Sequence, residues 1–297
     1  MHIPDGFLST PVWATLDAVS AAGAGWVTRV AQRGFDDSRV PLLGVMGAFV
    51  FAAQMINFPV GIGTSGHLVG GALLACTLGP AAASVVMIAI LAIQALVFQD
   101  GGILALGANV LNMALAGVAA GYLPYRMWGQ GRWRRAAIFA GGALSVGVSA
   151  LLALAELLIS GVRMPAGVLG LSLWLFLISA LIEGAITLAV MGALEAIQPD
   201  FARHQPARGA RYGLVAAGVV AVALAAGGVV IASSAPDGIE QMARQTGIAG
   251  HAQALLWAPL KDYQAAWLGS GRVAQAGVAL VGVALAGGVC AWLGRKR

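Results

Sequence analysis

The chain has 297 residues, of which 59% are hydrophobic and only 10% are charged. A soluble domain carries roughly 25% charged residues, so this composition excludes an ordinary soluble protein and predicts a helical membrane protein. The 42 glycines fit that class, because small residues let membrane helices approach closely. A membrane β-barrel is excluded, since its strands alternate over about ten residues, whereas the apolar runs here are longer and unbroken.

Nine apolar stretches are predicted to cross the membrane, which takes roughly 20 residues per helix. The first is weak because it contains Asp17. The third is short and ends at Gly79-Pro80, so we expect either a short span or a re-entrant loop near residues 61–64. The predicted spans are 10–32, 40–57, 66–79, 81–98, 102–123, 136–160, 167–195, 212–232 and 273–294.

A polar connector at residues 198–211 divides the chain into two predicted domains. Residues 1–200 contain seven spans, and residues 201–297 form a helical hairpin with an external loop over about 233–272. The predicted fold is therefore an all-α polytopic membrane protein, with a seven-helix domain followed by a two-helix hairpin. The two cysteines lie in apolar stretches, where they are expected to be small buried side chains without a disulfide.

The basic residues predict the orientation. With the N-terminus outside, 13 of the 17 Lys and Arg residues fall on the inner side of the membrane, including Arg203, Arg208, Lys296 and Arg297. Such a bias orients membrane proteins, and it explains the net charge of +5 without a nucleic-acid partner. We expect a multi-pass protein of a prokaryotic plasma (inner) membrane, with its C-terminus cytoplasmic and no signal peptide.

The four histidines differ in their surroundings. His204 in the polar connector and His251 in the external loop are expected to be surface residues. His67 lies in GIGTSGHLVGG, at the outer mouth of the third span, on the same predicted side as His2. Either residue alone would more often be structural, but two histidines on one side of the membrane indicate a metal site.

The N-terminus offers three nitrogen donors. Because His2 is large, Met1 is expected to remain, leaving an amine, the His2 amide nitrogen and the His2 Nδ1. These can form fused five- and six-membered chelate rings around a metal that deprotonates the amide, and His67 can close the fourth corner. Such a plane favours Ni²⁺ or Cu²⁺, with planar Co²⁺ also possible. The lack of a Cys cluster or carboxylate ring argues against zinc or calcium.

Three segments resemble the CbiM/NikM family: MHIPDGFL at the start, QMINFPVGIGTSGHLVGGAL at 54–73 and GANVLNMALAG at 107–117. These proteins are the substrate-binding subunits of energy-coupling-factor transporters for cobalt and nickel. SSAPDGIE at 233–240 resembles the PDGLE/CbiN-NikN segment that is often fused to this subunit, with Ile in place of Leu. The resemblance implies that the first residues fold back into the outer mouth and that Met1, His2 and His67 bind the metal.

The resemblance also implies partners. These are a transmembrane coupling subunit (CbiQ/NikQ-like) and ATPase subunits (CbiO/NikO-like), with Ni²⁺ or Co²⁺ as the transported substrate. The chain is not expected to be an enzyme or to bind a nucleotide itself, because neither lysine lies in a phosphate-binding GxxxxGK[ST] motif. The sequence does not separate nickel from cobalt.

Further polar and small residues have two interpretations each. Polar side chains expected to orient the ligands, or else to bond between helices, are Asp5, Gln54, Asn57, Thr64, Ser65, Asn109 and Asn112. The small-residue face of the second span is either a docking face for the coupling subunit or an internal packing face, and comprises Gly44, Ala48 and Ala52. Glu156 and Glu183, in apolar spans, are expected to be structural or neutral acids.

Three other functions are alternatives for such a sequence. Residues 63–66 match the GxSG pattern of intramembrane serine proteases, but such an enzyme needs a histidine base on a later membrane helix. A secondary divalent-cation transporter or channel would need charged residues along a path or paired repeats with broken helices. A scaffold would leave the N-terminus without a ligand.

Overall fold

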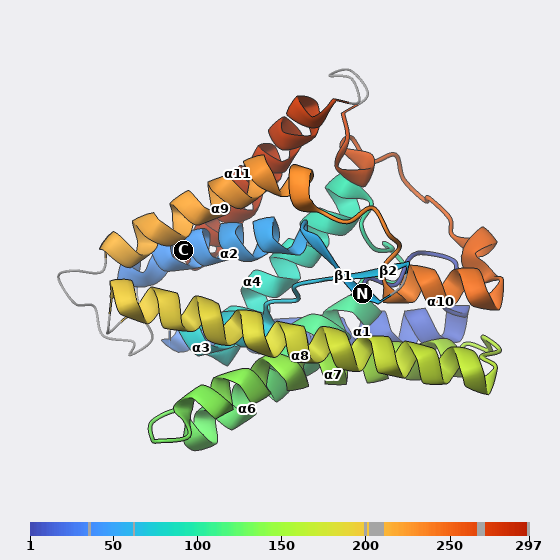
Figure 1. Cartoon of the computed structure of the whole chain (residues 1–297), viewed down its shortest axis with the longest axis horizontal. Coiled ribbons are helices and arrows are strands. Elements are labelled where there is room, and N and C mark those ends of the chain that lie inside the picture. The colour runs from blue at the N-terminus through green and yellow to red at the C-terminus, as the bar shows by residue number, and fades with distance from the viewer. Residues whose placement is uncertain (35–36, 62, 199–200, 202–210, 266–270, 296–297) are drawn as a thin grey trace.

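The computed structural model describes residues 1–34, 37–61, 63–198, 201, 211–265 and 271–295. Most of the polar connector, including Arg203, His204 and Arg208, lies outside these residues, as do Ile62, Lys296 and Arg297. The elements are almost all helical (Figure 1). The longer helices are α1 (Thr10–Gly34), α2 (Val40–Gln54), α4 (Pro80–Ile93), α6 (Val118–Trp128), α7 (Arg134–Ile159), α8 (Ala166–Ile197), α9 (Arg211–Ile231) and α11 (Arg272–Gly294).

Short elements connect them. The short α-helices are α3 (Gly71–Leu78), α5 (Leu106–Asn109) and α10 (Gly238–Thr246). Two π-helical stretches continue α4 and α5, namely η2 (Gln94–Phe98) and η3 (Val110–Gly117). Short 3₁₀ turns are η1 (Asp37–Arg39), η4 (Ile248–His251) and η5 (Lys261–Tyr263). The π-helical turns of η2 and η3 are wider than α-helical turns; such turns are rare and often lie near functional sites.

Each of the nine predicted spans contains a helix within the described residues. Six helical stretches are both long and apolar enough to cross a membrane: 80–98, 106–128, 134–159, 166–197, 212–231 and 272–294. The prediction of an all-α polytopic membrane protein is confirmed. The remaining three, α1, α2 and α3, are too short or too polar to qualify by themselves, in line with the weak first span and the short third span.

A β-hairpin replaces the helix that was predicted at two span ends. Strands β1 (Asn57–Gly61) and β2 (Thr64–His67) pair antiparallel, with Asn57 opposite His67. The predicted spans therefore run too far, since α2 ends at Gln54 and α3 begins at Gly71. The reason is local: Pro59 cannot donate a helical hydrogen bond, and the several glycines around it have low helix propensity. The alternative of a loop near residues 61–64 describes this region better.

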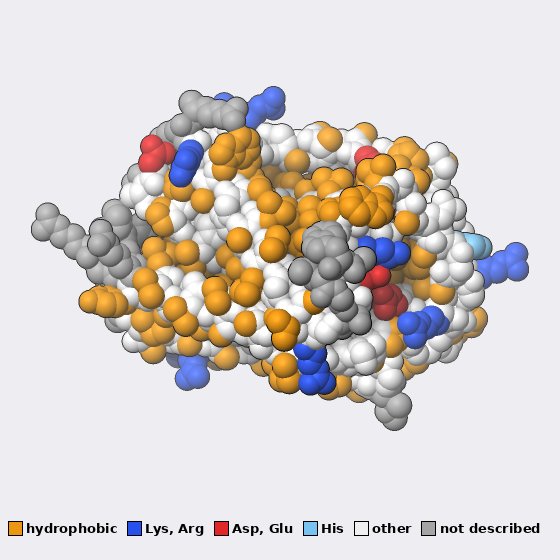
Figure 2. Space-filling model, turned by 90° about the horizontal axis from the view of Figure 1, so that it is seen from above, with side chains coloured by type: hydrophobic (Ala, Val, Ile, Leu, Met, Phe, Trp, Pro, Cys, Tyr) orange, Lys and Arg blue, Asp and Glu red, His pale blue; other side chains and the backbone are white. Residues whose placement is uncertain are grey.

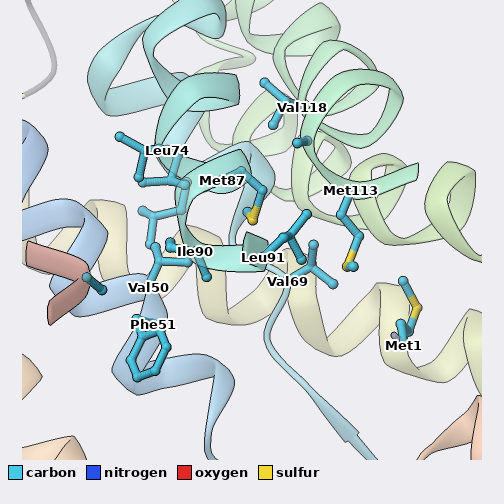
Figure 3. Packing of buried hydrophobic residues seen from close by; sticks show 14 of the residues in the cluster. Met1, Val50, Phe51, Val69, Leu74, Met87, Ile90, Leu91, Met113 and Val118 are labelled. Carbon is cyan, nitrogen blue, oxygen red and sulfur yellow. The ribbon is translucent and has the colours of Figure 1, made fainter. Parts of the chain in front are cut away.

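The core lies where α2, α3, α4 and η3 meet (Figure 3). Its fully buried side chains include Phe51, Leu74, Met87, Leu91 and Met113. The outer surfaces of the helices are also apolar, as Figure 2 shows for one face of the molecule. Large exposed side chains such as Trp174 on α8 are expected where lipid, rather than water, surrounds the protein.

The C-terminal hairpin packs on α2. A Cβ added to Gly44 would lie 3.0 Å from the Gly287 carbonyl oxygen and 3.1 Å from the Ala291 Cβ of α11. Ala48 lies against Gly287, and Ala52 is fully buried. The small-residue face of α2 thus packs against α11 of the same chain, the arrangement that the internal-packing interpretation describes.

Two glycines allow α7 and α8 to cross closely. A Cβ on Gly142 would lie 2.7 Å from the Gly184 Cα, and one on Gly184 would lie 2.6 Å from the Phe139 carbonyl oxygen. Backbone atoms cannot move aside as a flexible side chain can, so neither position has room for a larger residue.

We therefore expect Gly184→Leu to lower the free energy of unfolding by about 1–3 kcal/mol, the usual cost of overpacking. Unfolding of the full chain in detergent would measure this loss. Gly192→Leu in the same helix is the control, because a Cβ there meets nothing within 4 Å. Equal effects of the two substitutions would contradict the close crossing.

Candidate metal centre

The first five residues are held against the segment that leads into α5. The Asp5 carboxylate accepts hydrogen bonds from the amides of Ile103 (2.9 Å), Leu104 (2.8 Å) and Ala105 (3.2 Å). A Cβ on Gly102 would lie only 2.2 Å from Asp5 Oδ1, so glycine is needed for this approach. These contacts pin the N-terminal segment, which is consistent with the expectation that Asp5 helps to orient the ligands.

Asn109 binds the backbone on both sides of Ile3. The Ile3 amide donates to Asn109 Oδ1 at 2.8 Å, and Asn109 Nδ2 donates to the Ile3 carbonyl at 3.1 Å. The Gly102 amide donates to the same carbonyl at 2.9 Å. The Ile3 side chain is fully buried, so both apolar packing and hydrogen bonds fix the path of the chain just after His2.

The Met1 amine lies between an imidazole and a carboxylate. Its nitrogen is 2.7 Å from His67 Nε2 and 2.5 Å from Asp237 Oδ2. Figure 1 shows the N-terminus beside the β-hairpin and α10, two segments far apart in the sequence. The Met1 side chain joins the buried cluster (Figure 3), which further limits the positions that the amine can reach.

The His67 ring presents a lone pair to this amine. Its Nδ1 lies 2.9 Å from the Leu68 carbonyl oxygen, which can only accept, so Nδ1 carries the proton and Nε2 does not. Burial, followed by the positive charge of the Met1 ammonium, lowers the pKa of His67 to about 3. The imidazole is therefore a neutral nitrogen donor at pH 7.

His2 lies against His67. The two rings are parallel to within 6°, with centroids 5.2 Å apart. His2 Nδ1 is 3.1 Å from Asp100 Oδ1, and His2 Nε2 is buried without a hydrogen-bond partner among the described residues. Burial would raise the pKa of Asp100, but the neighbouring His2 and the Tyr263 hydroxyl, which donates to Asp100 Oδ2 at 2.6 Å, hold it below its ordinary value.

The backbone after His67 is anchored from the membrane interior. Glu183 of α8 accepts hydrogen bonds from the amides of Val69 (2.9 Å) and Gly70 (2.8 Å). Gln54 Nε2 donates to the Val69 carbonyl at 2.7 Å, and Gln54 Oε1 accepts from the Gln94 side chain. Glu183 is thus a structural acid, consistent with one of its two interpretations, and Gln54 contributes to the support of the His67 loop.

Asp237 is fixed by two neighbours. It is the N-cap of α10: its Oδ1 accepts from the Glu240 amide at 2.9 Å, and the Glu240 side chain accepts from the Asp237 amide in return. The preceding residues bind β2, since the Ser65 amide donates to the Pro236 carbonyl at 2.8 Å. Burial would raise the pKa of Asp237, but the charges of the Met1 ammonium and His67, together with the hydrogen bonds from the Met1 amine and the Glu240 amide, lower it.

The other predicted residues have different positions. Asn57 and Thr64 belong to the β-hairpin that carries His67, and the Ser65 hydroxyl donates to the Ala235 carbonyl at 2.7 Å. Asn112 donates to Glu156 of α7 at 2.8 Å, so it makes an interhelical bond, which is the alternative interpretation. His251 is exposed, as expected.

Four residues of the site were not predicted as members: Asp100, Glu183, Asp237 and Tyr263. Asp237 had a usable signal, because Asp followed by Glu three residues later is a helix-capping pattern. That pattern predicts the start of α10, but it does not reveal that the second carboxylate oxygen faces the amine of residue 1.

Comparison with known proteins finds relatives among proteins of metal uptake. A family model described as the cobalt uptake substrate-specific transmembrane region matches residues 2–201. A putative fused nickel transport protein NikMN of Archaeoglobus fulgidus is 39% identical over 233 residues, covering 75% of each chain. The fused nickel transport protein NikMN of Rhodobacter capsulatus is 30% identical over 340 residues, covering 96% of this chain and 94% of that protein.

A solved structure has a similar fold. The crystal structure of a truncated transition metal transporter superposes with a TM-score of 0.58 and is 34% identical, covering 66% of this chain and 99% of that one.

The role of Glu183 can be tested by Glu183→Gln. Glutamine keeps one acceptor oxygen, so one buried amide loses its partner and the unfolding free energy should fall by about 1–3 kcal/mol. Hydrogen exchange at Val69 and Gly70 should become faster. Glu195→Gln in the same helix is the control, because that carboxylate pairs with Arg134 near the surface and its loss should cost about 0–1 kcal/mol. Unchanged exchange at both amides would contradict the anchor.

Proposed function

Because the chain belongs to the CbiM family of cobalt-uptake transmembrane proteins, we propose that it captures Ni²⁺ or Co²⁺ at the outer face of the membrane. It then delivers the ion for ATP-driven uptake, as the substrate-binding subunit of an energy-coupling-factor importer. The related proteins named above are nickel transport proteins, so metal transport is the common activity. The observation that carries the proposal for the site is the contact between the Met1 amine and His67.

The separation of these two nitrogens suits a shared metal. Two neighbouring donors in a square plane, each about 2.0 Å from the metal, lie about 2.8 Å apart. Met1 N and His67 Nε2 are 2.7 Å apart, and His67 is already neutral with its lone pair directed at the amine. These two donors need little movement to bind one ion.

The His2 imidazole has to move more. Chelation of the metal by the amine, the His2 amide nitrogen and Nδ1 requires Nδ1 to face the amine, whereas it now faces Asp100. Metal binding would therefore replace the His2–Asp100 contact. The resulting four-nitrogen plane fits Ni²⁺, and also Co²⁺ in a planar geometry.

The remaining parts of the proposal concern assembly. Residues 1–200 would form the metal-binding domain, and residues 201–297 a CbiN/NikN-like hairpin, with the N-terminus outside and the C-terminus cytoplasmic. ATP hydrolysis would come from CbiO/NikO-like subunits acting through a CbiQ/NikQ-like coupling subunit. A putative fused cobalt transport protein CbiMQ of Methanocorpusculum labreanum supports the CbiQ-like partner, because its name joins CbiM and CbiQ in one chain.

Blocking the N-terminus tests the site. One extra residue before Met1 converts the amine to an amide, which cannot serve as the terminal donor. We expect the purified full chain to lose affinity for Ni²⁺ and Co²⁺ by more than the roughly 10–100-fold typical of removing an outer-shell partner. Calorimetry or chelator competition measures this.

Matched variants complete that test. His67→Ala should cause a similar loss, whereas His251→Ala changes an exposed histidine and should bind normally. One residue added after Arg297 is the control for the extension. Tight binding by both the extended chain and His67→Ala would exclude the site.

Proton release gives a second test. An ammonium and an amide each give up a proton when they become metal ligands, so roughly two protons should leave per ion at pH 7. His67 adds none, because its pKa is about 3. Affinity should therefore fall as the pH is lowered from 8 to 5. Calorimetry in buffers of different ionisation enthalpy counts the protons, and a count of about one or fewer would contradict an amide ligand.

A further inference from the structure

We propose that Asp237, in the C-terminal segment, is a positioning residue of the metal site, and that its carboxylate holds the Met1 amine beside His67. This inference rests on the proposed function, and it makes the site a joint product of the two ends of the chain. Asp237 lies outside residues 2–201, the region that the family model covers.

The two oxygens of the Asp237 carboxylate make different contacts. Oδ1 caps α10 by accepting from the Glu240 amide at 2.9 Å, while Oδ2 is 2.5 Å from the Met1 nitrogen. Capping alone needs only one oxygen, and Asn or Ser would cap equally well. The second oxygen is the one that requires a carboxylate, because the amine offers only N–H groups to it.

The position of Asp237 is set by contacts independent of Met1. Ser65 binds the two residues before Asp237, through its amide to Pro236 and its hydroxyl to Ala235, and Ser65 lies two residues before His67. On the other side, a Cβ on Gly238 would lie 2.7 Å from Phe176 Cε1, so α10 packs closely on α8. The carboxylate is thus held in a fixed relation to the His67 strand by contacts that do not involve the amine.

The contact between the Met1 amine and the Asp237 carboxylate can persist when the metal is bound. A coordinated amine keeps two N–H groups, and a carboxylate that accepts from one of them orients the nitrogen lone pair toward the metal. Outer-shell carboxylates act in this way on ligating imidazoles. The negative charge of Asp237 would also favour a divalent cation at a site whose other donors are nitrogens.

A second contact connects the C-terminal segment, through Asp100, to the His2 imidazole. Tyr263 donates its hydroxyl hydrogen bond to Asp100, the carboxylate that faces His2, and its ring stacks on Phe98 with centroids 4.7 Å apart. The Met1 amine and the His2 imidazole therefore each have a carboxylate beside them. One of these carboxylates belongs to the C-terminal segment, and the other is bound by it.

The substitution Asp237→Asn tests the roles of the two carboxylate oxygens separately. Its side-chain oxygen still caps α10, while an NH₂ group replaces Oδ2 and faces the amine, donor against donor. We expect Ni²⁺ and Co²⁺ affinity of the full chain to fall about 10–100-fold. The substitution also removes the ion-pair partner of the Met1 ammonium, so the unfolding temperature without metal should fall, and affinity is measured well below that temperature.

Glu240→Ala is the matched control. It removes the reciprocal half of the capping pair but keeps the Asp237 carboxylate, so metal affinity should be retained. Asp237→Ser is a second variant, since its hydroxyl caps the helix but is too short to reach the amine; it should lose affinity as Asp237→Asn does. The absorption spectrum of the nickel-bound chain, recorded at saturation, should change in the two Asp237 variants only.

The outcomes separate this inference from the proposed function. If Asp237→Asn and Asp237→Ser bind metal like the wild type while His67→Ala does not, Asp237 has no positioning role. Equal losses in Glu240→Ala and Asp237→Asn would also overturn it, because they would assign the effect to α10. Wild-type binding by His67→Ala would overturn the metal site itself, and this inference with it.

Discussion

A membrane protein must supply hydrogen-bond partners for backbone that is not helical, because lipid provides none. Here the first residues, the β-hairpin and the segment before α5 are all non-helical and meet at one place. Buried polar side chains provide the partners: Asp5 for residues 103–105, Asn109 for Ile3, and Glu183 for the backbone after His67. The same contacts that satisfy the backbone hold two imidazoles and an amine together.

The composition and span pattern predicted the fold class, because long apolar helices are encoded by local sequence. Boundaries near the hairpin were wrong, since Pro59 and its neighbouring glycines end helices but do not indicate that two short strands will pair. The meeting of Met1, His2 and His67 followed from motif and topology. The support around them was predicted in part: Asp5, Gln54 and Asn109 lie there, whereas Asn112 binds Glu156.

The contribution of the C-terminal segment could not be read from the sequence. Asp237 and Met1 are 236 residues apart, and Asp100 and Tyr263 are 163 apart, so no local pattern connects them. The small-residue face of α2 shows the same limit. Gly44 and Ala48 indicate that a helix packs closely, but only the three-dimensional structure identifies that helix as α11 of the same chain.

The charges around the site are consistent with the binding of a divalent cation. His67 is neutral because burial and the adjacent ammonium oppose its protonation. Without metal, the Met1 ammonium pairs with the carboxylate of Asp237, while the carboxylate of Asp100 faces His2. A divalent ion that takes the amine as a neutral ligand supplies that positive charge instead, so the Asp237 carboxylate keeps a counter-charge in both states. A neutral molecule bound to the amine would leave the part-buried Asp237 carboxylate without a counter-charge, and this favours cations over neutral molecules by electrostatics alone.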